Sequence, residues 1–548
     1  MSRDGTKLMV IGLDGATYDL ILPWVKAGEL PVFGRLLKES AWGPLESTRP
    51  PLTCPAWPVF YTGRNPGKLG VMDFINGNGG DRIVSYEDVK GPAFWDLAAR
   101  GGLRSVVINV PVTYPPRIAK GVMLSGMLTP PDRPFCTSRE IMDDIETQVG
   151  EYLVDLDIVT LGSFDRRRSL NRFYHMMEQR HKTAMYLKKT YPHDIMVVVF
   201  QGPDIVAHRL WNQKKDVLGV YRLMDRFVGE LARDVESLLI MSDHGFAGHE
   251  KGVRINQFLF ERGDLARQKA DHPVGFTHGS SAILKHRFDA ANDPGLARID
   301  WLRKWFWRLG VNRTLIKRIV GEQRVLETMK RRAPSILKKL IPPDRFDIDR
   351  EKSTAFLHAT RTRSICINPH RIRRGVSYEV YKRRLIEDLL SMTDKERGTR
   401  VFSRIYHRDE LYHGPYVAQF PDLFLETAPS YLVRGDFGSS VIARFPAPKS
   451  AHDQKGIFLW RGPTIRPGFC PESIRLVDLA PTILYLLGIP IPREMDGHVC
   501  GSIMKEHRIG LEAYADEPDS DRQGIREWMS HADEREIIDK LRALGYMD

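Results

Sequence analysis

Six residues whose side chains can bind metal ions lie beside apolar runs of the sequence: Asp14, Asp204, His208, Asp243, His244 and His452. Asp204 and His208 are four residues apart, a spacing that places both side chains on one face of a helix, where they can bind the same ion. Asp243 and His244 follow the apolar run LLIM and precede Gly245, which permits the irregular backbone that two adjacent ligands need. Because carboxylates and imidazoles together suit hard-to-borderline divalent ions, the set predicts two mixed Asp/His metal sites.

Each cluster also has an ordinary structural interpretation when it is considered alone. Asp14 could be a turn residue, Asp204 a helix cap with His208 on the surface, and Asp243 with its neighbour part of a turn, while His452 is a single loop histidine. The metal interpretation is favoured because all of these residues lie at the edges of predicted core strands. In doubly wound sheets, ligands bind at the carboxyl ends of the strands.

Six apolar segments bounded by turn residues predict buried strands: 7–13, 104–110, 194–200, 237–242, 421–426 and 456–461. Several are apolar on both faces, as are the strands of a parallel sheet covered by helices. Helical patterns at 166–190 and 216–236 alternate with them, and a helix over 475–487 is expected to end at Gly488. This alternation predicts an α/β fold with a doubly wound, mostly parallel sheet between helices.

The alternation of strands and helices stops at about residue 266 and resumes near residue 400. We therefore expect 1–265 and 401–505 to form a catalytic α/β core, 266–400 to be an inserted cap, and 506–548 to be a helical tail. Within the cap, residues 301–340 contain twelve Lys or Arg against two Glu, together with three Trp. This composition suits a helix that lies on an anionic membrane surface, and a solvated cap helix whose aromatic side chains pack on the core fits it equally.

The composition of the 548-residue chain narrows the class of protein. With 42% hydrophobic residues, no glycine period and five Cys, a disordered chain, a collagen and a disulfide scaffold are excluded. The chain has no apolar run of about 18 residues, no signal-peptide pattern and no specific nucleic-acid motif. We expect a cytoplasmic protein with reduced cysteines, and membrane association through 301–340 is left open.

The order of the motifs resembles that of the alkaline phosphatase superfamily, in particular its type I phosphodiesterase/nucleotide pyrophosphatase branch. These motifs are Asp-Gly after the first strand, a threonine motif about forty residues later in RPPLTCPAWPVFYTG, then DxxxH, SDHG and a late His. The resemblance spans about 1–265 and 401–505. It implies an alkaline-phosphatase-like fold, a phosphate-ester substrate and two divalent ions, with zinc as the first expectation and manganese as the second.

The resemblance also implies which residues form each metal site. One ion would be bound by Asp204, His208 and His452, and the other by Asp14, Asp243 and His244. Thr53 would be the nucleophile, would contact an ion through its oxygen and would form a covalent phospho-threonine. Thr53 precedes Pro55 at a predicted helix start, where backbone amides and the helix dipole favour an anion, whereas Thr62 falls late in that helix and Thr48 outside it.

Two departures from the family pattern limit the choice of substrate. A sulfatase of this superfamily carries Cys or Ser at the position of Thr53 and Arg four residues later, whereas this chain has Trp57 there and Cys54 displaced by one. Sulfatase activity is therefore disfavoured, and Cys54 is expected to be a packing residue. Nucleotide pyrophosphatases place a phosphate-binding Asn in the loop after the nucleophile helix, where this chain has Phe74, so Asn76 or a backbone amide would have to substitute.

These observations favour a metal-dependent phosphohydrolase, in particular a phosphodiesterase. A phosphotransferase or phosphomutase of the same superfamily is an alternative, because the acceptor of the phosphoryl group is chosen by the cap. A non-catalytic member that binds an anionic lipid or polymer through its basic segment is a second alternative, which the intact set of ligand residues disfavours. His249, His278 and His358 are expected to be structural or surface residues.

Overall fold

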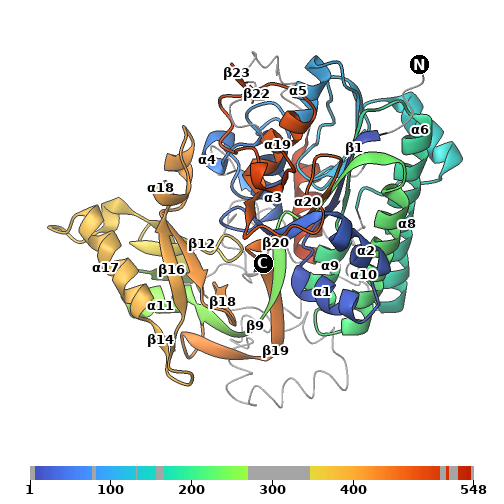
Figure 1. Ribbon diagram of the computed structural model, residues 1–548. Helices are drawn as coiled ribbons and strands as arrows, with labels where there is room; N and C mark the ends of the chain where they lie inside the picture. The colour runs from blue at the N-terminus through green and yellow to red at the C-terminus, as the bar shows by residue number, and fades with distance from the viewer. Residues whose placement is uncertain are drawn as a thin grey trace, which may run out of the picture. The chain divides into compact units, whose positions relative to one another are not determined.

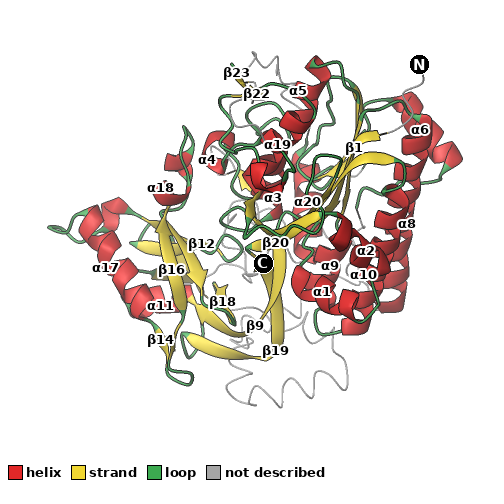
Figure 2. Cartoon of the chain, viewed as in Figure 1, coloured by secondary structure: helices red, strands yellow, loops and turns green. Residues whose placement is uncertain are grey.

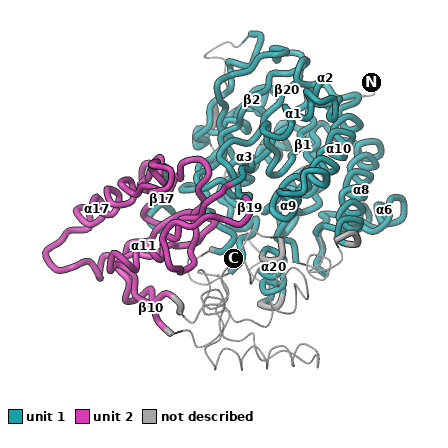
Figure 3. Tube along the Cα trace, turned by 90° about the horizontal axis from the view of Figure 1, so that it is seen from below, with its two compact units in different colours: residues 1–248, 411–420, 449–547 teal, residues 249–410, 421–448, 548 magenta. Residues whose placement is uncertain are grey.

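The computed structural model describes residues 6–76, 82–130, 132–155, 166–269, 346–506, 514–516 and 529–544. The chain divides into two compact units (Figure 3). Unit 1 comprises 1–248, 411–420 and 449–547, and unit 2 comprises 249–410, 421–448 and residue 548. The basic segment 301–340 and His278 lie outside the described residues, so the interpretation of that segment stays a prediction.

Unit 1 contains an eight-stranded sheet with the order β21-β2-β20-β8-β1-β7-β5-β6 (Figure 1). These strands are β1 (Thr6–Leu13), β2 (Ala41–Glu46), β5 (Ser105–Val110), β6 (Gly121–Ser125), β7 (Ile195–Phe200), β8 (Val235–Met241), β20 (Lys455–Arg461) and β21 (Ile474–Arg475). β1 is parallel to both of its neighbours, with Val10 opposite Val197 on one side and Leu239 on the other. β20 runs antiparallel to β2 and β8, and the other pairs are parallel, which confirms the predicted mostly parallel α/β sheet.

Helices cover both faces of this sheet (Figure 1). On one face α2 and α9 pack against α10, and this group comprises α1 (Tyr18–Lys26), α2 (Pro31–Glu39), α8 (Arg166–Thr190), α9 (Gly202–Leu210) and α10 (Lys214–Leu231). On the other face α3 (Thr53–Thr62), α5 (Phe94–Arg100) and α19 (Leu479–Leu486) pack together. The helix expected over 216–236 ends at Leu231, because the chain enters β8 at Val235. α19 ends just before Gly488, whose φ of +68° few other residues adopt.

The remaining elements of unit 1 are short or peripheral. They are α4 (Pro66–Leu69), α6 (Arg139–Gln148), α20 (His531–Leu544) and the strand pairs β3 (Ile75–Asn76) with β4 (Arg82–Ile83) and β22 (Ile491–Pro492) with β23 (Tyr514–Ala515). Within the described part of the chain, every helix is too short or too polar to cross a bilayer.

Unit 2 is built on a four-stranded antiparallel sheet with the order β12-β13-β17-β16 (Figure 2). The elements of this unit are α11 (Ile255–Glu261), β10 (Ala266–Lys269), β11 (Phe346–Asp349), β12 (Ala355–Ala359), β13 (Ser364–Ile367), α17 (Tyr378–Ser391), β14 (Thr393–Asp394), β15 (Thr399–Arg400), β16 (Phe402–His407), β17 (Leu423–Thr427) and β18 (Tyr431–Arg434). It has its own core, in which Leu259, Leu357, Leu385 and Leu423 are buried.

The apolar run at 421–426 forms a strand, but not one of the parallel sheet. It is β17, which pairs antiparallel with β13 and β16. Because β16, β17 and β18 pair with strands of unit 2, residues 401–410 and 421–448 belong to that unit, together with 249–265. Unit 2 is therefore more extensive than the expected cap at 266–400.

Candidate metal centre

The six predicted ligand residues come from four places in the chain, and all lie in unit 1. Asp14 directly follows β1, and Gly15 turns the chain there with a φ of +69°. Asp243 and His244 follow β8, where Gly15 N–H donates to Asp243 Oδ1 at 3.3 Å. The ends of two adjacent parallel strands are thereby tied together at the carboxyl edge of the sheet.

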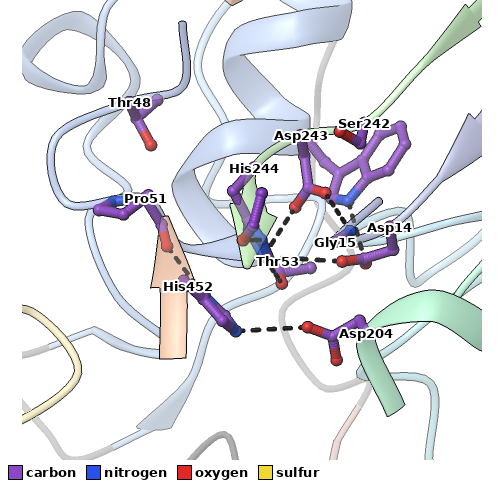
Figure 4. A network of polar contacts seen from close by, with 12 residues as sticks. Asp14, Gly15, Thr48, Pro51, Thr53, Asp204, Ser242, Asp243, His244 and His452 are labelled. Atoms are coloured by element: carbon purple, nitrogen blue, oxygen red, sulfur yellow. Dashed lines mark hydrogen bonds and ion pairs between the residues drawn. The ribbon is translucent and has the colours of Figure 1, made fainter. Parts of the chain in front are cut away.

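Asp204, His208 and His452 form the first group of potential metal ligands. Asp204 and His208 lie on one face of α9, and His452 lies near the end of β19 (Ile442–Asp453). Asp204 Oδ1 is 3.3 Å from His452 Nε2 (Figure 4). It is 3.5 Å from His208 Nε2, and the two imidazole nitrogens are 2.9 Å apart. One ligand atom from each residue lies within 4.8 Å of the others.

Asp14, Asp243 and His244 form the second group, which satisfies the same distance limit. His244 Nε2 is 3.6 Å from Asp14 Oδ1 and 3.4 Å from Asp243 Oδ2, and all three side chains are fully buried (Figure 4). The imidazole rings of His244 and His452 stack with their centroids 3.7 Å apart, so the two groups are neighbours. The predicted ligands thus form two candidate metal-binding groups, consistent with a binuclear site.

The carboxylate oxygens of these groups fit a cation. Asp14 Oδ1, Asp243 Oδ2 and both oxygens of Asp204 are buried, and within the described part of the chain they have no hydrogen-bond donor of suitable geometry. A buried carboxylate without a donor is costly, and an ion bound by the oxygens removes that cost. Carboxylate oxygen with imidazole nitrogen is a donor set that both zinc and manganese accept.

Backbone carbonyls orient two of the three histidines. His452 Nδ1 is 2.9 Å from Pro51 O, and His244 Nδ1 is 3.1 Å from Gly245 O. Because a carbonyl only accepts, both Nδ1 atoms carry hydrogen and both Nε2 atoms present a lone pair to the site. This is the tautomer that a metal ligand requires.

The pKa values reflect three carboxylates buried together. Burial, then repulsion from Asp243 and Asp204, raises the pKa of Asp14 well above its usual value, and burial with repulsion from Asp204 raises the pKa of Asp243 to about 8. Burial alone would raise the pKa of Asp204, but His208 and His452 outweigh it and lower that pKa to about 2. Burial lowers the pKa of His208 to about 4, so this imidazole is neutral at physiological pH.

Thr53 is the first residue of α3, and its side chain is fully buried against the second group. Its Oγ1 is 3.2 Å from His244 Nε2 (Figure 4). Leu52, which precedes the helix, offers no side-chain acceptor to the first-turn amides. A hydroxyl next to the second carboxylate–imidazole group and at a helix N-terminus lies where an anion is favoured.

The other residues that were singled out in the sequence, where the structure describes them, belong to neither candidate group. Thr62 ends α3 and donates to Pro58 O at 2.6 Å, and Thr48 donates to Pro50 O at 2.7 Å. Cys54 is buried and forms no disulfide. Phe74 is fully buried, while Asn76 lies in β3 and its side chain is outside the described residues. His249 and His358 lie in unit 2.

Three contacts of this centre were not predicted from the sequence. They are the carbonyls of Pro51 and Gly245 and the indole N–H of Trp57, which donates to Asp14 Oδ2 at 3.4 Å. Every residue has a backbone carbonyl, so the residue type cannot show that the carbonyls of Pro51 and Gly245 orient the histidines. The position of Trp57 near the site could have been predicted, because Trp57 lies one helical turn after Thr53.

We expect metal ions to raise the melting temperature of the protein, and to raise it more at higher pH. At about pH 5 Asp243 is protonated in the metal-free folded chain, because burial raises its pKa to about 8, so an ion must displace this proton. Burial shifts the pKa of Asp14 in the same direction. His208 is already neutral at pH 5, so the ion displaces no proton from its imidazole. The difference in melting temperature between metal-loaded and chelated protein should therefore grow up to about pH 8, and an ion at 100 times its Kd should add about 2.7 kcal/mol. Equal melting temperatures at pH 8 with and without zinc or manganese would contradict the metal assignment.

An eight-stranded, mostly parallel sheet with two Asp/His groups and a hydroxyl at its carboxyl edge defines a protein of the alkaline phosphatase superfamily. The model of the type I phosphodiesterase/nucleotide pyrophosphatase family matches residues 8–304, more than half of the chain. The chain therefore belongs to the type I phosphodiesterase/nucleotide pyrophosphatase family, as its motifs predicted.

Two solved structures of one enzyme share this fold at low sequence identity. Phosphonoacetate hydrolase from Sinorhizobium meliloti 1021 is similar in its complex with phosphonoformate, with a TM-score of 0.54, 12% identity, and coverage of 89% of this chain and 96% of that chain. Its complex with phosphonoacetate gives a TM-score of 0.52 at 13% identity over the same shares of the two chains. Murine ectonucleotide pyrophosphatase/phosphodiesterase 5 gives a TM-score of 0.45 at 13% identity, covering 91% of this chain and 100% of that chain. Among curated proteins, none matches the chain.

Proposed function

We propose that the protein is a metal-dependent phosphoester hydrolase, in particular a phosphodiesterase, that acts through a covalent phospho-Thr53. The observation that carries the proposal is the position of Thr53 Oγ1, 3.2 Å from His244 Nε2 at the start of α3. Membership of the type I phosphodiesterase family supports the reaction class.

Each candidate group would hold one divalent ion, with zinc preferred and manganese second. Asp204, His208 and His452 would bind one, and Asp14, Asp243 and His244 the other. Bound ions would supply positive charge that lowers the pKa of the Thr53 hydroxyl and neutralises the phosphoryl oxygens.

The chain's own residues account for the other requirements of the reaction. Pro51 and Gly245 hold His452 and His244 with Nε2 toward the site, and the α3 N-terminus favours the phosphoryl anion next to Thr53. In the first step Thr53 Oγ1 forms a bond to phosphorus while the bond from phosphorus to the alcohol oxygen breaks, and the alcohol leaves with the Thr53 proton. In the second step water attacks the same phosphorus, the bond from phosphorus to Thr53 Oγ1 breaks, and a proton of the water goes to Thr53. Burial of the site excludes bulk water from the first step.

The substrate is proposed only as a phosphate ester. Phe74 occupies the position at which the family's nucleotide-binding Asn is expected, and its fully buried phenyl group offers no hydrogen bond to a phosphate. Nucleotide specificity is therefore not part of the proposal. Trp57 in place of a sulfatase arginine argues against sulfate esters.

A panel of substrates tests the proposal. The chain would be stripped of metal, reloaded with zinc or with manganese, and offered phosphodiesters, phosphomonoesters, a phosphonate and a sulfate ester. We expect phosphodiesters to be hydrolysed fastest and the sulfate ester slowest. Addition of an alcohol acceptor separates hydrolysis from phosphoryl transfer. Absence of turnover of every phosphoester by a chain shown to hold two ions would overturn the proposal.

A further inference from the structure

Trp57 packs beneath the second metal-binding group. Its indole is fully buried, and its Nε1 donates to Asp14 Oδ2 at 3.4 Å. The ring is confined from the strand side, because a Cβ at Gly12 would lie 2.4 Å from its Cη2 atom, and it meets Phe60 edge-to-face at 5.7 Å. The donor is therefore held in place by β1 and by α3 itself.

The two carboxylates of this group share one pattern. In Asp14 the oxygen Oδ2 accepts from Trp57, while Oδ1 has no donor and lies 3.6 Å from His244 Nε2. In Asp243 the oxygen Oδ1 accepts from Gly15 N–H, while Oδ2 has no donor and lies 3.4 Å from His244 Nε2. Each carboxylate thus has one oxygen fixed by the protein and the other directed toward the imidazole.

The first group lacks this pattern. Among the described residues, neither oxygen of Asp204 accepts a hydrogen bond of suitable geometry, and its Oδ1 lies 3.3 Å from His452 Nε2 and 3.5 Å from His208 Nε2. A donor to one oxygen fixes the torsion of a carboxylate and leaves the other oxygen for an ion. The donor to Asp243 is a backbone amide, whereas the donor to Asp14 is a side chain that can be replaced by mutation.

We propose that Trp57 is a positioning residue for the ion bound by Asp14, Asp243 and His244, acting through its N–H on Asp14 Oδ2. The inference rests on the proposed function only for the presence of two ions, and it does not depend on the substrate. It assigns a role to the position where a sulfatase of the superfamily has an arginine. Loss of such an outer hydrogen bond lowers metal affinity by about 10- to 100-fold.

The test measures metal affinity in the full chain, with one group disabled at a time. His452→Ala leaves the Asp14 group intact, and Asp243→Ala leaves the Asp204 group intact. Adding Trp57→Phe should weaken binding of the remaining zinc or manganese ion by about 10-fold or more in the first background and leave it unchanged in the second. If these backgrounds bind no ion, the same comparison is made in the wild-type chain, where Trp57→Phe should weaken one of two binding steps.

Two controls separate the N–H from the volume of the ring. A benzothienylalanine at position 57, introduced by nonsense suppression, keeps the shape of the indole but has no N–H, so it should weaken binding as Trp57→Phe does. Phe94→Leu removes buried aromatic volume beside Phe60, one ring further from Asp14 than Trp57, so it should leave both affinities unchanged. Equal weakening in both backgrounds, weakening by Trp57→Phe but not by benzothienylalanine, or no weakening at all would each overturn the inference. Failure of the proposed function would show differently, as absent phosphoester turnover in a chain that binds two ions.

Discussion

Replacement of Thr53 by Ala should lower turnover of the best phosphoester by at least about 1,000-fold while the chain keeps both metal ions. Thr53 supplies the attacking oxygen in the proposed mechanism, and neither the three carboxylates nor the three imidazoles change in this variant. Thr53→Ser should retain measurable turnover, because only a methyl group is lost. Turnover and metal content would be measured on the same preparations.

A matched control for this variant lies on the same helix. Thr62 is also a fully buried threonine of α3, and its hydroxyl donates to Pro58 O rather than facing the metal-binding groups. Thr62→Val should therefore keep wild-type turnover within about tenfold, the loss that an intrahelical hydrogen bond and small packing changes explain. If Thr53→Ala kept more than about a tenth of wild-type turnover, water would attack phosphorus directly, and the covalent mechanism would be wrong.

Removal of a single metal ligand should have the second-largest effect. Asp243→Ala and His452→Ala should each cost about one bound ion per chain, and turnover should fall by at least about 100-fold, because the second ion is needed to stabilise one of the two reacting oxygens. Elemental analysis after dialysis against a known free metal concentration gives the number of ions.

Asp225 provides the control for this loss of metal. It is a buried carboxylate that accepts from Val32 N and Phe33 N and belongs to neither candidate group. Asp225→Asn should lower stability but keep two ions per chain. The two-ion site would be contradicted if the Asp243→Ala chain kept the metal content of the wild type. It would also be contradicted if an active wild-type preparation contained no divalent metal.

The ends of the central strands could be predicted well from the sequence, and the ligands with them. The runs that form β1, β5, β7 and β8 are apolar on both faces, so they identify strands of a sheet covered by helices. Asp14 and Asp243 follow two of these runs directly. Helical periodicity alone predicts that Asp204 and His208, four residues apart on α9, lie on the same face of that helix.

The partners of each strand could not be predicted in the same way. The run that forms β17 was predicted together with those of the central sheet, yet it pairs antiparallel with β13 and β16. The run that forms β20 does join the central sheet, but antiparallel to β2 and β8. Apolar content reports burial, whereas direction and partner depend on contacts between segments far apart in the chain. β2 was not predicted at all, since Gly43 and Pro44 interrupt its pattern.

The orientation of the ligand side chains could not be predicted from the sequence either, because it depends on their contacts in the folded chain. The tautomers of His244 and His452 depend on two backbone carbonyls, and the orientation of Asp14 depends on the indole of Trp57. The contacts of Pro51 with His452 and of Trp57 with Asp14 join segments far apart in the chain, which no local pattern encodes. The sequence predicted the members of the two candidate metal-binding groups, and the structure adds how each side chain is oriented.

The stereochemistry at phosphorus tests the covalent mechanism most directly. A phosphorothioate diester of known configuration would be hydrolysed in ¹⁸O-labelled water by the metal-loaded wild-type chain, and the configuration of the chiral product would be determined. Each in-line displacement inverts the configuration at phosphorus, so attack by Thr53 followed by attack by water predicts net retention. Net inversion would show a single displacement by water and would contradict the phospho-Thr53 mechanism.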